Sequence, residues 1–187
     1  MSALFAAIGR AFAALLKWLI AAVFLGAMVH GALVWFALQI IMGFVLSGVA
    51  ERAGGTNRML HAEPVTAAAR EVVMPSPDLL YSLCSVELLR GPVRVTAPRP
   101  AGALYWSVAL YSETTDNVFV TNDRTAPTGA DFVIVGPGQA SLAPDGVQVV
   151  ESPSFDALIL IRTLVDRPDA LDGLDRERRQ AVCAPAG

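Results

Sequence analysis

The chain has few of the side chains on which common catalytic and metal sites depend. Lys17 is its only lysine, and His30 and His61 are its only histidines. Because neither residue type follows position 63, residues 64–187 cannot assemble a Ser-His-Asp or Cys-His nucleophile, a His-ligated zinc site or a Schiff-base lysine. Glycine-rich phosphate loops of the P-loop or dinucleotide type are missing too. We therefore expect no catalytic residue of these classes, no metal site and no cofactor.

Charge is absent from a long stretch near the N-terminus. No Asp, Glu, Lys or Arg occurs among the 33 residues from Trp18 to Ala50. A bilayer core needs about 20 apolar residues in a helix, and this run would reach about 50 Å at about 1.5 Å per residue. It is too short for two spans and a turn, so it predicts one long or tilted transmembrane helix. The alternative is a cleaved signal peptide, but the apolar stretch of such a peptide has only about 7–15 residues.

The charges beside this run say little about its orientation. Arg10 and Lys17 precede it, and Arg52 and Arg58 follow it. Because orientation follows Lys and Arg rather than net charge, the two sides are balanced, and the amino terminus tips the balance slightly toward a cytoplasmic N-terminus. The lipid bilayer is the first partner that the sequence predicts.

Positive charge is also scarce in the rest of the chain. Residues 71–187 contain 15 acidic residues and 9 arginines, which gives a net charge of −6. A nucleic-acid-binding module would show a basic patch, and a second contact with anionic lipid would need one as well. We therefore expect no nucleic-acid partner.

The residues after the apolar run indicate a linker and one β-rich domain. Glycines and prolines punctuate residues 51–75, where residues 65–73 could form a short helix. Beyond them, β-branched and aromatic residues recur in short runs bounded by Pro, Gly or Asp, which predicts strands. The predicted strands are residues 80–88, 93–96, 104–112, 117–121, 132–135, 147–151 and 157–165.

Seven short strands at close spacing favour a sandwich or a barrel. The predicted fold class is therefore mainly β, an antiparallel sandwich-like domain, with one N-terminal transmembrane helix and one C-terminal helix. The predicted parts are residues 1–50 (N-terminal segment and transmembrane helix), 51–75 (linker) and 76–187 (β-rich domain).

The C-terminal helix is predicted from its charges and its apolar face. Asp169 or Asp172 can cap it, and Asp175 precedes Arg179 by four residues, which favours an ion pair along the helix. Its apolar face consists of Leu171, Leu174 and Val182.

Five sequence blocks follow one another between Ser76 and Asp166. They are Asp78-Leu79-Leu80-Tyr81; Glu87-Leu88-Leu89-Arg90-Gly91-Pro92-Val93; Leu104 to Ser112 with Thr115-Asp116-Asn117; Val135-Gly136-Pro137-Gly138; and Arg162-Thr163-Leu164-Val165-Asp166. In their order and content these blocks resemble the domain of unknown function 1254 family. The resemblance implies a mostly antiparallel β-sandwich-like domain, and it implies no settled reaction.

The chain departs from the family pattern in two ways. Ser112 stands where the family usually has an acidic residue, and Asp116 replaces one of two paired asparagines. Longer relatives carry a second β-domain, the domain of unknown function 1214, which is expected to be absent because this chain stops at Gly187. The resemblance thus suggests a partner, namely a separate protein that carries the second domain.

The recurrent residues have a structural and a functional interpretation. Gly136 and Gly138, with Pro137 between them, favour a tight turn, and Arg162 inside an apolar strand needs a carboxylate or carbonyl partner if it is buried. In the functional alternative, a polar pocket for an anionic ligand is lined by Tyr111, Asn117, Arg124 and Arg162. The residues expected to maintain the family's structural motif are Asp78, Tyr81, Gly136, Pro137, Gly138, Thr163 and Asp166.

Two functions remain open at this point. The first is a non-enzymatic, single-pass protein of the bacterial inner membrane, whose β-domain lies outside the cytoplasm, in the periplasm, and binds a partner protein. The alternative is a hydrolase that uses carboxylate and arginine side chains on an anionic small molecule.

The two cysteines bear on this choice. Cys84 lies in the first predicted strand, and Cys183 lies at the end of the predicted C-terminal helix. An even pair in an exported domain favours a disulfide, whereas the same pair in the cytosol would be two reduced, mostly buried thiols. We predict a Cys84–Cys183 disulfide and hence a cytoplasmic N-terminus with the domain outside. The alternative is a pair whose Cα atoms lie more than about 7 Å apart and cannot bridge.

Overall fold

The computed structural model of the chain describes residues 2–66, 75–140, 143–144 and 146–186. It forms two compact units, residues 1–40 and 41–187. The helix α1 (Ser2–Ala53) supplies the first unit and enters the second. Each unit is described by itself below.

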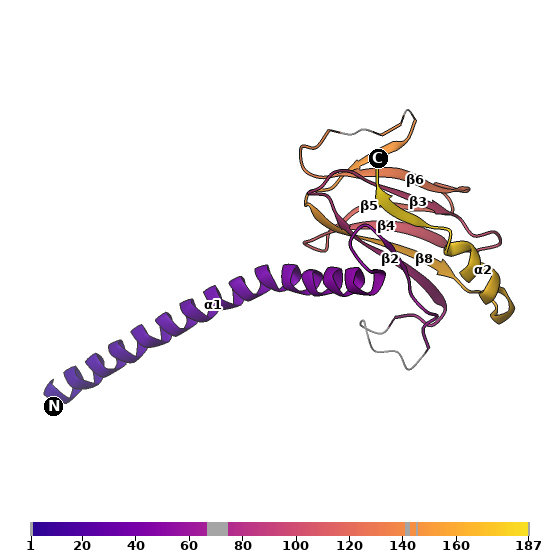
Figure 1. Ribbon diagram of the computed structural model, residues 1–187. Helices are drawn as coiled ribbons and strands as arrows, with labels where there is room; N and C mark the ends of the chain where they lie inside the picture. The colour runs from indigo at the N-terminus through magenta and orange to yellow at the C-terminus, as the bar shows by residue number, and fades with distance from the viewer. Residues whose placement is uncertain (1, 67–74, 141–142, 145, 187) are drawn as a thin grey trace. The chain divides into compact units, whose positions relative to one another are not determined.

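The first unit is a helix with the composition of a membrane span (Figure 1). An 18-residue window within Phe12–Ala53 has a mean hydropathy of 2.2, and this helix is the one candidate span within the described residues. Its large apolar side chains point outward; Trp18 is 77% and Trp35 is 73% exposed. Apolar exposure on this scale is typical of a surface that lipid covers, and not of the core helix of a soluble domain. The predicted apolar helix is confirmed.

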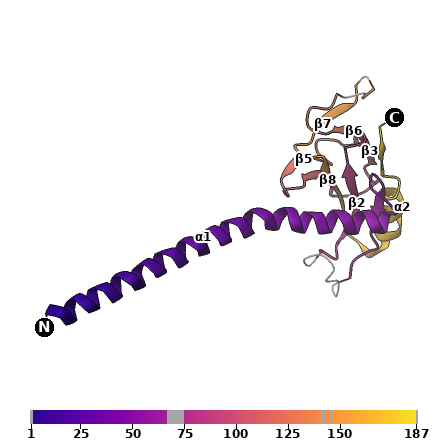
Figure 2. The ribbon, with the colours of Figure 1, turned by 60° about the vertical axis from the view of Figure 1, so that its left-hand side comes forward.

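The second unit is a sandwich of two β-sheets (Figures 1 and 2). Sheet A has the strand order β1-β2-β8-β4-β5, and sheet B has the order β7-β6-β3-β9. All neighbouring strands are antiparallel except β6 and β7, which are parallel. The strands are β1 (Met59–His61), β2 (Leu79–Glu87), β3 (Val93–Pro98), β4 (Trp106–Ser112), β5 (Asn117–Asn122), β6 (Gly129–Val135), β7 (Gln148–Glu151), β8 (Asp156–Leu164) and β9 (Val182–Pro185).

The period of two in the sequence explains which faces meet. In β3, Val93 and Val95 are fully buried, while Arg94 between them lies on the outer face and pairs with Asp131. From the two sheets, Trp106 and Phe132 are the largest apolar side chains of the core, each 1% exposed. Burying such a side chain stabilises a fold by about 1.5–3 kcal/mol, so this alternation is the main driving force for the sandwich.

All seven predicted strands are present with small shifts at their ends, and two further strands were not predicted. β1 (Met59–His61) lies within the stretch predicted as a linker and pairs with β2. β9 (Val182–Pro185) pairs with β3 and lies where the prediction extended the C-terminal helix. β1 and β9 are short and show no clear alternation in the sequence. β1 forms because β2 offers it backbone partners, and β9 forms because β3 does so.

The C-terminal helix is shorter than predicted. It comprises a 3₁₀ turn, η1 (Pro168–Ala170), and α2 (Leu171–Arg178), and no side chain caps the N-terminus of α2. The assignment of Val182 to its apolar face is wrong, because this side chain is 52% exposed on β9. The short helix predicted at 65–73 lies mostly outside the described residues.

The last turns of α1 belong to the β-domain. Met42, Leu46 and Val49 are buried together with Leu158 on the outer face of sheet A. Residues 18–40 alone span about 35 Å at about 1.5 Å per residue, which is enough to cross a bilayer. The excess length of the uncharged run is therefore explained by a segment that packs on protein.

A glycine pair ends α1 and starts the return to β1. Gly54 and Gly55 have φ values of 76° and 143°, and the Gly55 amide donates to the carbonyl of Ala50 at 2.8 Å. Positive φ costs glycine little, so this sequence can close the helix and reverse direction within a few residues. The turn places β1 beside β2 directly after the helix.

Candidate functional site

The four predicted ligand residues lie at two ends of sheet A. Tyr111 of β4 pairs with Asn117 of β5, whereas Arg162 of β8 pairs with Ser107, four residues earlier on β4. Four residues along a strand correspond to about 13 Å. Arg124 follows β5, where its backbone amide donates to Asn122 Oδ1 at 2.9 Å. The structure therefore brings Arg162 and Arg124 to one end and Tyr111 and Asn117 to the other.

Tyr111 has a packing role in this arrangement. It is half-buried and contacts the cluster that α1 forms with Leu158. Asn117, its partner across the sheet, is exposed, and the register shifts between Leu110 and Tyr111. The last turns of α1 pack on this end of the sheet, which we call the seat of α1. A binding role for these two residues stays a prediction.

Arg162 is half-buried on the outer face of β8. Tyr81 on β2 and Ser107 on β4 lie directly opposite it on either side. The guanidinium carbon lies 5.9 Å from the centroid of the Tyr105 ring, a cation–π contact. Its Nε is buried without a hydrogen-bond partner among the described residues. The prediction of a carboxylate or carbonyl partner for Arg162 is wrong for the described residues. The ring of Tyr105 lies beside the guanidinium instead.

The buried, paired arginine is Arg178 of α2, which the sequence analysis missed. It is 2% exposed. Its Nη1 donates to the Tyr81 carbonyl at 2.7 Å and to Ser82 Oγ at 3.1 Å, and its Nη2 donates to the Ala62 carbonyl at 2.6 Å. Its Nε donates to Asp175 Oδ1 at 2.7 Å. One side chain thereby joins α2 to β2 and to the end of β1.

His61 extends this set of contacts. Its Nδ1 lies 2.9 Å from Ser82 Oγ, and Asp175 also binds Arg179 at 2.8 Å. We call Arg178, Ser82, His61, Asp175 and Arg179 the Arg178 cluster. The sequence analysis had placed this histidine in a linker outside the domain, and the structure places it in β1.

The Arg178 cluster does not form a nucleophile. Ser82 is 1% exposed, so a substrate carbonyl cannot reach its hydroxyl. Arg178 donates to Ser82 Oγ, and the same oxygen is the hydrogen-bond partner of His61 Nδ1, so the hydroxyl is engaged on two sides. Burial lowers the pKa of His61 below its ordinary value, and the charges of Arg178 and Arg179 lower it further, with Asp175 opposing. These contacts hold α2, β1 and β2 together, and they include a titratable histidine.

The family's glycine-proline-glycine block forms the expected turn. Gly138 has φ +67°, and a Cβ on Gly136 would lie 2.8 Å from the ring of Phe155. Gln139 Oε1 accepts from the Gly136 amide at 2.8 Å, and its Nε2 donates to the Leu88 carbonyl at 2.6 Å. The turn after β6 is thereby fastened to the end of β2, which is a structural role.

The other motif residues also hold segments in place. The Tyr81 hydroxyl accepts from the Ser76 amide at 3.0 Å, and the Asp78 carbonyl accepts from the Val165 amide at 2.9 Å. Thr163 is fully buried, and Asp166 lies 3.6 Å from Arg167 in an ion pair. The bond between Asp78 and Val165 connects the start of β2 with the end of β8, whereas the buried Thr163 hydroxyl has no hydrogen-bond partner among the described residues.

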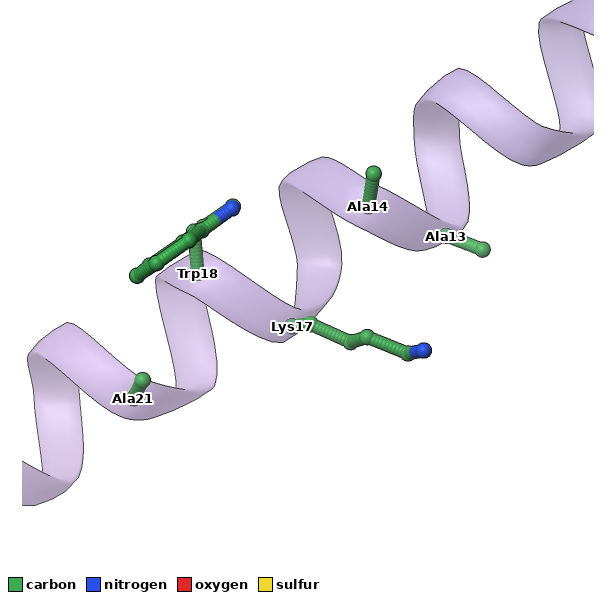
Figure 3. Close-up of a pocket in the computed structure, with 5 residues that line it drawn as sticks. All are labelled: Ala13, Ala14, Lys17, Trp18 and Ala21. Carbon is green, nitrogen blue, oxygen red and sulfur yellow. The ribbon is translucent and has the colours of Figure 1, made fainter.

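A hollow on α1 is not a ligand site. Figure 3 shows that Lys17 and Trp18 leave one helix in different directions, with only alanines beside them. The lining residues are Ala13, Ala14, Lys17, Trp18 and Ala21. A basic and an aromatic side chain at the start of an uncharged run are typical of the headgroup level of a membrane. Among the described residues, no group of three or more His, Cys, Asp or Glu could hold a metal ion.

The predicted disulfide is confirmed. Cys84 and Cys183 are bonded, with their Cα atoms 6.5 Å apart. Cys183 lies in β9 and not at the end of a helix, so the bond joins sheet A to sheet B through the core. Both half-cystines are buried, at 0% and 4% exposure.

Two solved protein structures are similar to this chain. No curated protein matches the chain. A crystal structure of the VPA0106 protein from Vibrio parahaemolyticus is similar to it with a TM-score of 0.63 and 14% identity, covering 80% of this chain and 35% of that one. A putative uncharacterized protein from Burkholderia cenocepacia gives a TM-score of 0.45 and 16% identity, covering 72% of this chain and 37% of that one.

The first comparison supports the fold alone, and this chain spans about a third of the length of both solved proteins. The family model described as "Protein of unknown function (DUF1254)" matches residues 56–185. That range begins just before β1 and ends in β9, so it includes the two strands that the sequence blocks left out. The chain therefore belongs to the DUF1254 family.

Proposed function

We propose that this protein is a single-pass, membrane-anchored component of the bacterial cell envelope, with a cytoplasmic N-terminus and its β-domain in the periplasm as a binding module. The observation that carries the proposal is that one chain has both the Cys84–Cys183 disulfide and an apolar helix long enough to cross a membrane. Disulfides persist in oxidising compartments and are rare in the bacterial cytosol. A membrane-anchored domain with a bridged core fits the periplasmic face of the inner membrane.

Alkaline phosphatase and green fluorescent protein, each fused after Gly187, test the location. Phosphatase is active only outside the cytoplasm, so we expect phosphatase activity and no fluorescence. Fluorescent cells with inactive phosphatase would contradict the proposal. A matched fusion after Arg10, which lies before the span, should give the opposite pattern and excludes an artefact of expression.

The partner that we propose is a separate protein carrying the second domain of longer relatives, the domain of unknown function 1214. The choice rests on the family resemblance described above and on the family match over residues 56–185. The described β-domain also keeps large apolar side chains exposed on the edge strands β5, β7 and β9. They are Val120, Val149 and Val182.

Co-purification of the tagged full chain from native membranes tests the partner. We expect a second protein to elute with the full chain and not with a tagged helix comprising residues 1–58, which controls for association through the anchor. A monodisperse, partner-free monomer would contradict this part of the proposal.

We do not propose the hydrolase. Such an enzyme needs a carboxylate beside the arginine that holds its anionic substrate. Among the described residues, the Arg162 guanidinium forms a cation–π contact with the Tyr105 ring and no ion pair with a carboxylate. No described carboxylate pairs with Arg124 either, so the required pair is not assembled.

A further inference from the structure

Arg162 is one of the arginines of the β-domain that have no acidic partner among the described residues. Several others have acidic partners: Arg94 binds Asp131, Arg178 binds Asp175, and Arg167 lies beside Asp166 and Asp169. Arg162 forms no ion pair or hydrogen bond with a described residue, although its Nε is buried. Partial burial of an unpaired cation costs free energy. In a domain with excess negative charge, Arg162 has no counter-charge among the described residues.

The surroundings hold Arg162 in place without neutralising it. The Tyr105 ring lies against the guanidinium, and the Tyr105 hydroxyl donates to Ser107 Oγ at 2.9 Å, which fixes the ring. On the other side, Tyr81 is fixed through the bond from the Ser76 amide to its hydroxyl. We call Tyr81, Tyr105, Ser107 and Arg162 the Arg162 cradle. Its members come from three adjoining segments of sheet A, so backbone hydrogen bonds set their spacing.

The cradle is a separate place from the seat of α1. Leu83 and Leu160, which pair with each other, lie two residues along β2 and β8 from Tyr81 and Arg162. Leu83 packs on the last turns of α1. Two residues correspond to about 7 Å, so the cradle begins one row beyond that seat.

We propose that the Arg162 cradle is a binding site for an oxyanion, that is, a carboxylate or phosphate group. A guanidinium offers a planar fork of N–H donors that matches two oxygens of such a group. The Tyr105 ring lies on one side of the guanidinium, and Tyr81 and Ser107 are the cross-strand neighbours of Arg162 on β2 and β4. This inference rests on the β-domain being a binding module and names the chemistry of what it binds, independently of membrane orientation.

The experiment uses the full chain in nanodiscs of zwitterionic lipid, with ¹⁵N-labelled arginine. Inorganic phosphate and succinate are titrated separately, and the side-chain Nε–H signals are followed. We expect a saturable shift of the Arg162 signal with at least one anion, and the arm that saturates at lower concentration identifies the preferred group. Absence of a saturable shift with both would overturn the proposal.

Variants separate a built site from general attraction. Arg162→Gln should weaken anion binding about tenfold or more, since a charge-assisted hydrogen bond is lost, and Arg162→Lys should weaken it because the planar fork is lost. Arg176→Gln removes the same charge from an exposed position on α2 and should leave binding unchanged. For the variants, binding is read by calorimetry, and circular dichroism together with an intact disulfide shows that each is folded.

Equal losses in Arg162→Gln and Arg176→Gln would mean non-specific attraction and would overturn the site. If Arg162→Gln does not fold, Arg162→Lys keeps the charge and decides the question. Failure of co-purification would leave the anion titration unaffected, so the two proposals can fail separately.

Discussion

Two arginines of this domain show how far burial and pairing decide what a charged residue does. Arg178 is 2% exposed and donates to two backbone carbonyls, one hydroxyl and one carboxylate. Arg162 is half-buried and donates to no described residue. The first has its hydrogen-bonding capacity used by its own protein, so its role is structural. The second has no such partner among the described residues, which is the basis of the proposed anion site.

Replacing Arg178 with methionine should destabilise the domain strongly. The change keeps most of the side-chain volume but leaves the Tyr81 and Ala62 carbonyls without this donor. Removing one partner of a buried pair costs about 3–5 kcal/mol, and we expect about 3 kcal/mol because Asp175 is partly exposed and keeps Arg179. Urea unfolding of the detergent-solubilised chain measures the free energy of unfolding.

The matched control is Arg176→Met on the same helix, where the side chain is exposed and the expected change is within about 0.5 kcal/mol. If both variants unfold at the same urea concentration, the Arg178 cluster contributes nothing beyond the charge.

His61 makes the stability of the Arg178 cluster depend on pH. Its pKa is lowered by burial and then by Arg178 and Arg179, with Asp175 opposing and Glu63 paired to Arg179 nearby. Because the unfolded chain takes up the proton more readily, the stabilising contribution is complete above the ordinary pKa of about 6.5 and declines as pH falls below it. We expect a lower free energy of unfolding at pH 5.5 than at pH 7.5.

His61→Gln should remove that part of the pH dependence, since glutamine keeps a polar group beside Ser82 and does not titrate. All other groups are the same in the two proteins, so the difference between the two curves isolates His61. Parallel curves between pH 7.5 and 5.5 would refute the assignment.

At the scale of elements, the disulfide connects the two sheets. Cys84 lies in the second strand of sheet A, and Cys183 lies in β9, a four-residue edge strand of sheet B. β9 has few backbone bonds of its own, so the covalent bond fixes it in place. The closed segment has a sequence separation of 99 residues, for which the chain-entropy model gives about 4–5 kcal/mol.

Reduction of the disulfide should lower the free energy of unfolding by about 2–5 kcal/mol and increase amide exchange in β9 before other strands. Hydrogen exchange with mass spectrometry, with and without reductant, measures both effects. The double variant Cys84→Ala, Cys183→Ala should behave like the reduced protein and show no response to reductant. A response to reductant in this variant would indicate another cause.

The end of α1 should be needed for the stability of the β-domain. Leu46 is 9% exposed against sheet A, and Leu46→Ala should cost about 2 kcal/mol or more through lost burial and a cavity. Phe44, two residues earlier, is 75% exposed, so Phe44→Ala should leave the unfolding of the domain unchanged. Urea unfolding of both variants in the same detergent measures the contrast, and equal effects would show that helix insertion is being measured instead.

The elements that the sequence predicts are those whose information is local. The seven predicted strands show alternation or apolar runs, and the uncharged run marks the helix. β1 and β9 depend on pairing with β2 and β3, and no pattern within three or four residues indicates that. The same reason explains the missed Arg178, because its acceptors at Tyr81 and Ala62 lie 97 and 116 residues away.

The candidate site shows the same division between local and distant information. Arg162 was found because a charged residue inside an apolar strand is unusual. The partners of Arg162 depend on strand order, which places β8 between β2 and β4. Tyr105 lies within the predicted strand 104–112 and just before the observed β4, and no pattern in the sequence marks it as a partner of Arg162. A sequence can thus indicate the unusual residue, while the sheet topology decides what lies beside it.

At the scale of the whole molecule, the anchor and the disulfide provide linked information about location. Only an exported domain is expected to form the bond between Cys84 and Cys183, so the state of these cysteines reports the orientation of the helix. The flanking charges are balanced, with Arg10 and Lys17 before the uncharged run and Arg52 and Arg58 after it. A small change in charge should therefore have a large effect on topology.

The double variant Arg10→Gln, Lys17→Gln should place a substantial fraction of the chains with the domain in the cytoplasm, because it removes both basic side chains that precede the span. Those chains should carry two free thiols, and a maleimide that adds mass, applied under denaturing conditions without reductant, should shift them on a gel. Arg58→Gln removes a basic residue from the other side, which strengthens the original orientation, and its chains should stay fully bridged and unshifted. The C-terminal fusions show whether the double variant has its domain in the cytoplasm. If such chains are still fully bridged, disulfide formation does not depend on the compartment. The main support for the periplasmic location is then lost.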